Sequence, residues 1–107
     1  MQANIYTLLD GVTATGAGGA VKLTQKRTNI FPSSIHVSGI VAGDVVSIEG
    51  TIATEAEIDA GTCTWTEING GSFTADSLDS IATNFSGIRA NLTANAGGGT
   101  VTVKIEI

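Results

Sequence analysis

Apolar and polar residues alternate along much of this chain, and the alternation is cleanest near the C-terminus. In residues 100–107 every second position is apolar, and the same pattern covers residues 88–94. A period of two is typical of a β-strand with one buried face. The glycine-rich residues 95–99 join these segments, and glycine accepts the positive φ of tight turns. The sequence therefore predicts an antiparallel hairpin over residues 87–107.

Similar alternating segments predict further strands upstream, at residues 5–9, 20–24, 34–38, 44–54, 62–68 and 72–75. The segments 34–38 and 44–54 form a second expected pair, joined by a turn-rich link. A turn is expected at residues 69–71, whereas residues 76–85 fit either a helix or a short strand over 81–85. About eight short strands predict an all-β fold, a two-sheet antiparallel β-sandwich of jelly-roll type. One domain is expected over residues 1–107.

Composition supports the all-β prediction and restricts the partners. Thr, Ile and Val together make up about a third of the 107 residues, and 14 glycines interrupt the chain. Hydrophobic residues make up 42% and charged residues 14%, which excludes disorder for most of the length. A net charge of -5 argues against nucleic acid and anionic membranes as partners. The single cysteine excludes an intrachain disulfide.

The alternation also predicts which side chains form the core. Residues that share the inward parity on neighbouring strands are expected to pack together. The predicted core consists of Val46, Ile48, Ile52, Trp65, Ile88, Leu92, Val101, Val103 and Ile105.

Residues that could support chemistry are few, and we predict no enzyme, no cofactor and no metal site. His36 is the lone histidine and falls on the polar face of its strand, where it is expected to face solvent. Cys63 has the inward parity and is expected to be a small core residue. Glu55, Glu57 and Asp59 are expected to form a solvated acidic edge, with a calcium site as the alternative.

Several segments resemble small β-sandwich proteins encoded among the virion structural genes of tailed bacteriophages. The strings are Ser-Gly-Ile-Arg-Ala-Asn-Leu-Thr at 86–93 and Gly-Thr-Val-Thr-Val-Lys-Ile at 99–105. An early Leu-Leu-Asp-Gly-Val-Thr-Ala-Thr-Gly-Ala-Gly at 8–18, a Val-Ser-Gly at 37–39 and a Val-Ser-Ile-Glu-Gly at 46–50 complete the likeness. In many relatives the last of these runs into a Ser-x-Asp-Gly turn, which is absent here.

The resemblance implies a capsid decoration (cement) protein that binds and stabilises the phage head shell, or else a minor head or tail protein. The implied partners are the major capsid protein and further copies of the chain, as a homotrimer, and the implied location is the virion, after synthesis in the bacterial cytoplasm. The basic residues Lys22, Lys26 and Arg27 lie within six positions of one another and are the candidate capsid contacts.

A receptor- or glycan-binding module, such as part of a tail fibre, is the alternative function. Exposed aromatic side chains near Tyr6, Phe31 or Trp65 would favour it, because sugar-binding sandwiches present aromatic rings on their surface.

Overall fold

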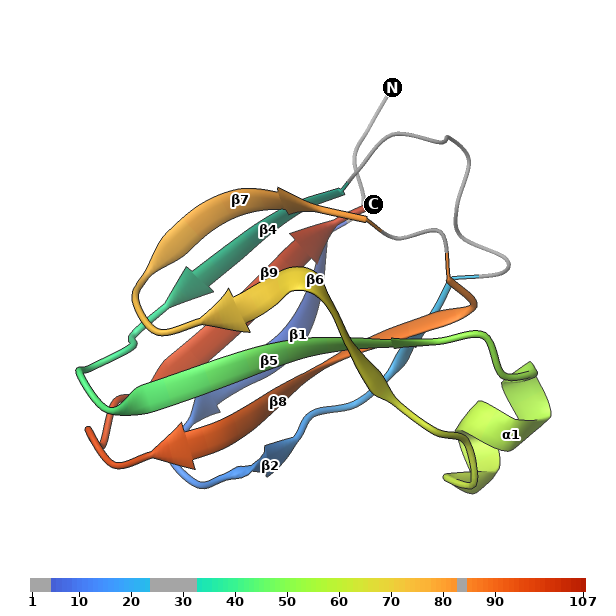
Figure 1. Cartoon of the computed structure of the whole chain (residues 1–107), viewed down its shortest axis with the longest axis horizontal. Coiled ribbons are helices and arrows are strands. Elements are labelled where there is room, and N and C mark those ends of the chain that lie inside the picture. Colours follow the sequence, from blue (N-terminus) through green and yellow to red (C-terminus); the bar gives the residue numbers. More distant parts are fainter. Residues whose placement is uncertain (1–4, 24–32, 83–84) are drawn as a thin grey trace.

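The computed structural model describes residues 5–23, 33–82 and 85–107 (Figure 1). Within these ranges the chain forms nine strands and one short helix. The strands are β1 (Ile5–Val12), β2 (Gly16–Ala17), β3 (Val21–Lys22), β4 (Ser33–Ser38), β5 (Asp44–Thr51), β6 (Thr66–Phe73), β7 (Ser77–Ile81), β8 (Gly87–Asn95) and β9 (Val101–Glu106). The helix α1 (Glu55–Ala60) lies between β5 and β6.

The strands form two antiparallel sheets that pack on each other. The four-stranded sheet has the order β1-β9-β4-β7, and the five-stranded sheet has the order β2-β8-β5-β6, with β3 also pairing with β8. Helix α1 lies at one end of the sandwich, and the β4–β5 and β8–β9 links lie at the other (Figure 1). The predicted all-β two-sheet sandwich is confirmed.

The strand pairing follows the path of a jelly roll. β1 pairs with β9, β2 and β3 pair with β8, β4 pairs with β7, and β5 pairs with β6. These pairs are the successive rungs of one long hairpin whose tip lies between β5 and β6. Rolling up this hairpin brings β9 beside β4 and β8 beside β5. The result is the double-sheet arrangement found in viral capsid and lectin domains.

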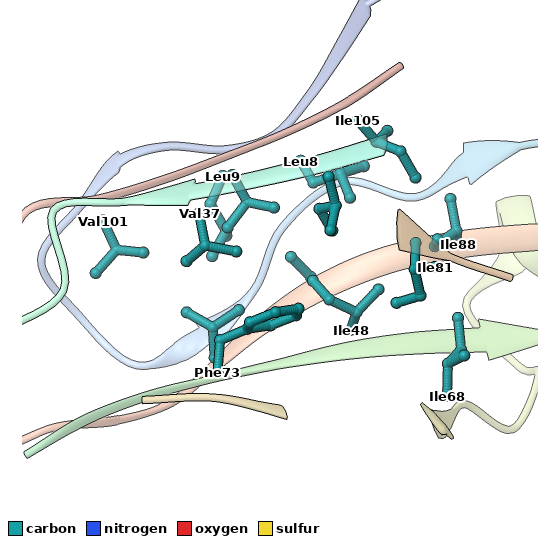
Figure 2. Close-up of a cluster of buried hydrophobic side chains, with 14 of the residues drawn as sticks. Leu8, Leu9, Val37, Ile48, Ile68, Phe73, Ile81, Ile88, Val101 and Ile105 are labelled. Carbon is teal, nitrogen blue, oxygen red and sulfur yellow. The ribbon is translucent and has the colours of Figure 1, made fainter. Parts of the chain in front are cut away.

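The hydrophobic core fills the space between the two sheets (Figure 2). Both sheets contribute, because every strand that alternates turns its apolar side chains toward the opposite sheet. Seven of the nine predicted core residues are buried, namely Val46, Ile48, Ile88, Leu92, Val101, Val103 and Ile105. The periodicity of the sequence therefore identified the inner faces of β5, β8 and β9.

Ile52 and Trp65 were wrongly assigned to the core. Ile52 follows the end of β5 and is 85% exposed. The predicted strand 44–54 stops at Thr51 because Thr54 begins the helix, so the alternation no longer applies at position 52. Trp65 precedes β6 and is half-buried on the outer face of the five-stranded sheet.

The two predicted hairpins are also wrong. β8 pairs with β5 in the five-stranded sheet, whereas β9 pairs with β1 and β4 in the four-stranded sheet. β4 and β5 are likewise in different sheets. The β4–β5 link and the β8–β9 link therefore each cross from one sheet to the other. Alternation shows which face of a strand is buried, but it does not show which strand lies beside it.

The expected turn at residues 69–71 is a bulge inside β6. Residues 68–71 lie opposite the single residue Ile48 of β5, so the ladder shifts at this point. Gly70 has a φ of 76°, and a Cβ on Gly71 would lie 2.9 Å from the carbonyl oxygen of Ile48. Only glycine fits both requirements without displacing the backbone, and the strand continues through the bulge.

The carboxylate of Asp44 joins the two links that cross between the sheets. Asp44 is fully buried, and its Oδ2 accepts hydrogen bonds from the backbone N–H groups of Val41 at 2.9 Å and Gly99 at 3.0 Å. Its Oδ1 accepts from the backbone N–H of Gly97 at 2.9 Å and from the side-chain amide of Asn95 at 3.2 Å. The bond from Val41, with those from the glycine-rich link, holds the pKa of Asp44 below its usual value despite burial.

Asp44→Asn should destabilise the fold at neutral pH and make its stability less sensitive to acid. The variant turns an NH₂ group toward backbone donors, so we expect a lower melting temperature. Because the folded-state pKa lies below the usual value of about 3.9, the carboxylate stabilises the fold above that value and loses this effect as the pH falls through the folded-state pKa. Thermal melts followed by circular dichroism should show the wild-type and variant melting temperatures converging on acidification.

Asp10→Asn is the matched control, because Asp10 is an exposed carboxylate on β1. It should leave the melting temperature near that of the wild type at every pH. A variant at position 44 that melts like the wild type at neutral pH would show that the two links do not depend on this carboxylate.

Candidate functional site

Helix α1 begins and ends with strong local signals. Thr54 is its N-cap, and the Oγ1 of Thr54 accepts a hydrogen bond from the backbone N–H of Glu57 at 3.2 Å. In return the backbone N–H of Thr54 donates to Oε1 of Glu57 at 3.0 Å, which completes a capping box. That donation lowers the pKa of the Glu57 carboxyl. Gly61 ends the helix with a φ of 72°.

Lys22 of β3 forms ion pairs with two acidic residues of helix α1. Its Nζ lies 3.0 Å from Oδ1 of Asp59 and 3.9 Å from Oε1 of Glu55. The hydrogen bond and attraction to Asp59, with a smaller contribution from Glu55, raise the pKa of Lys22. The structure thus places one of the three candidate capsid-contact residues in an ion pair with α1. The other two, Lys26 and Arg27, lie outside the described residues.

A polar network covers the outer face of the five-stranded sheet beside the helix. Nε of Arg89 donates to Oε1 of Glu49 at 2.7 Å, and the two side chains are only 26% and 14% exposed. The side-chain amide of Asn91 lies 3.4 Å from Oε2 of Glu49. Ser47 donates to Oε1 of Glu67 at 2.7 Å, which links β5 to β6. These contacts leave the network balanced in charge at its centre, where Arg89 meets Glu49.

Trp65 packs on this outer face and connects it to α1. The guanidinium carbon of Arg89 lies 4.7 Å from the centre of a Trp65 ring, within the range of a cation–π contact. A Cβ on Gly87 would lie 3.3 Å from Cη2 of Trp65 and 2.9 Å from Cδ1 of Ile58. The missing side chain of Gly87 therefore provides the space into which the indole and the helix pack.

A groove of about 580 Å³ opens at the helix end of the sandwich, and we call it the end groove. It is lined by residues 50–53, 62–64 and 66–69, together with Glu57 of the helix and Phe85. Its volume lies within the range of small-molecule sites. Its position is set by α1, because the segment that returns from the helix to β6 forms one wall.

The remaining candidate residues lie apart from one another. His36 is exposed on the outer face of the four-stranded sheet, as expected, and pairs across the ladder with Lys104 and Leu78. Cys63 is half-buried and lines the end groove, so the expectation of a small core residue is not met. Cys63 lies in the segment before β6, and none of residues 62–65 belongs to the buried core.

The helix could have been recognised from a four-residue signal. Thr54 and Glu57 have the Ser/Thr-x-x-Glu spacing of a capping box. The strand alternation instead predicts a strand through residue 54, followed by a solvated acidic edge at Glu55, Glu57 and Asp59. In the structure they lie on α1, where one completes the cap and the other two contact Lys22.

No family model, no curated protein and no solved structure matches the chain. Within the described ranges, no helix is long and apolar enough to cross a membrane.

Gly87→Ala should displace Trp65 and α1 from the sheet. The added methyl would meet Ile58 and the indole, and overpacking of this kind costs about 1–3 kcal/mol of unfolding free energy. Urea denaturation should report the loss of stability. Because Trp65 is the only tryptophan, its fluorescence should shift toward longer wavelength as the indole gains solvent.

Gly19→Ala is the control for this substitution, because a Cβ at Gly19 meets no atom within 4 Å. It should leave both stability and fluorescence close to wild type. Unchanged fluorescence in the Gly87 variant would mean that the indole does not depend on the space above this glycine.

Proposed function

We propose that this chain is a non-enzymatic virion structural protein that decorates the head shell of a tailed bacteriophage. Two kinds of support favour this role. The segments of the sequence that resemble phage decoration proteins cover much of the chain, and the jelly-roll architecture is one that viral capsid domains use. Fold alone does not determine function, so the proposal depends on a surface that can bind another protein.

The observation that carries the proposal is an exposed apolar pair on the four-stranded sheet. Leu78 is 78% exposed and Ile5 is 65% exposed, and both lie on its outer face. They border a shallow groove of about 200 Å³ whose lining also includes His36, Lys104 and Glu106. Exposed apolar side chains with polar neighbours are typical of protein contact surfaces.

Ile5 and Leu78 offer an apolar surface for a contact between copies of the chain. Ile5 lies on β1 and Leu78 on β7, the two opposite edge strands of this sheet. A contact between copies that covers this face would bury both side chains, and in a homotrimer such contacts would join three copies in a ring. The proposed homotrimer would close such a ring and match a threefold position on the shell.

Light scattering on the purified protein tests the assembly. We expect the mass of a trimer at micromolar concentration, whereas a mass near 10.8 kDa would contradict it. Leu78→Ser should shift the population toward monomer, because a polar side chain replaces the apolar contact. Ile52→Ser is the matched control, since Ile52 is as exposed as Leu78 but lies at the end of the sandwich that carries α1.

Binding to the shell tests the role itself. The protein should sediment with expanded capsids of a phage whose genome encodes this chain, and Leu78→Ser should weaken this binding by disrupting the ring. A trimer that does not sediment with these capsids would overturn the decoration role while leaving the assembly intact.

A further inference from the structure

The end groove combines apolar side chains with hydroxyl and amide groups around one opening. Ile52 stands at its edge with 85% of its side chain exposed. Phe85 is half-buried, and a Cβ on Gly50 would lie 3.0 Å from its ring, so the ring lies against the backbone of β5. Thr64 and Asn69 line the groove as well. Threonine hydroxyls and asparagine amides both donate and accept hydrogen bonds.

The charge of the groove restricts the ligand. Among the described residues that line it, only Glu57 and Glu67 are charged, and both are acidic. Oε1 of Glu57 accepts hydrogen bonds from the backbone N–H and the hydroxyl of Thr54. Oε1 of Glu67 accepts one from the hydroxyl of Ser47. Two carboxylates without a cation beside them in this lining repel anions. Phosphate-containing ligands and acidic sugars are therefore disfavoured.

The shape of the groove argues against two other classes of ligand. A peptide could add to β6, which is an edge strand, but the bulge at residues 68–71 interrupts the ladder beside the groove. A lipid would need an enclosed apolar cavity, whereas this groove is open and carries threonines. A ligand with many hydroxyl groups and one apolar ring face fits the mixed lining better than either.

We infer that the end groove binds a neutral saccharide. The ring of Phe85 and the side chain of Ile52 would contact the C–H face of a sugar. Thr64, Thr66 and Asn69 would exchange hydrogen bonds with its hydroxyl groups. The inference does not rest on the capsid role, because the groove lies at the helix end and the apolar pair Ile5 and Leu78 lies on the other sheet.

Titration of the ¹⁵N-labelled full chain, followed by NMR, tests the inference. The probes are glucose, galactose, mannose, N-acetylglucosamine, maltose and lactose, with glucuronic acid as the anionic comparison. We expect at least one neutral sugar to shift the amide signals of residues 62–69 saturably. Glucuronic acid should bind more weakly than glucose because of Glu67. No shifts with any probe, or shifts confined to other surfaces, would overturn the inference.

Variants then test the named contacts. Thr64→Val and Thr66→Val remove one hydroxyl each at nearly constant shape, and each should weaken binding about threefold to tenfold. Ile52→Ser should weaken binding without changing the mass of the assembly. Thr74→Val is the matched control, because Thr74 is exposed just beyond β6 and does not line the groove. Equal losses in the control and the groove variants would overturn the assignment of the site.

Leu78→Ser separates the two proposals. It should lower the mass of the assembly and leave sugar binding unchanged. A variant that loses both would show that the saccharide site needs the assembled ring, which contradicts a site formed within one chain.

Discussion

The buried carboxylate of Asp44 is the interaction on which the two-sheet arrangement depends. A buried charge is costly unless hydrogen bonds replace its water, and here four donors do so. Three of these donors are backbone N–H groups in the two links that cross between the sheets, so one side chain fixes two separate parts of the backbone. The registers of β9 on β4 and of β8 on β5 both begin at these links. A change at this residue therefore affects both sheets at once.

The end of the sandwich that carries helix α1 is held by contacts of a different kind (Figure 1). Helix α1 is fixed by its own cap, by the ion pairs of Lys22 and by the contact of Trp65 with Arg89 over Gly87. These contacts are partly exposed, and ion pairs at the surface contribute little to stability. The end groove lies among them. The molecule thus has one end fixed by a buried carboxylate and the other end, around the end groove, fixed by partly exposed contacts.

Local information in the sequence sufficed for the faces of the strands but not for their partners. Ile88 and Val101 are buried in the structure, as they would also be in a hairpin, so their parity could not distinguish the two arrangements. Asp44 gave no signal, because its donors lie up to 55 positions away along the chain. The Thr-x-x-Glu spacing of Thr54 and Glu57 is, by contrast, a local signal that predicts the start of the helix. The end groove could not be foreseen, since it depends on where α1 places the segment before β6.

The jelly-roll topology has a consequence for how the protein folds during translation. β1 has one neighbour in its sheet, β9, and Ile5 pairs with Glu106 across nearly the whole chain. During synthesis β1 therefore has no ladder partner in this sheet until β9 has been made. Contacts between residues so distant in sequence close slowly, because the intervening chain must be ordered first. Until then the apolar side chains on the inner face of β1 lack the strand that pairs with it, and exposed apolar surface of this kind is prone to aggregation.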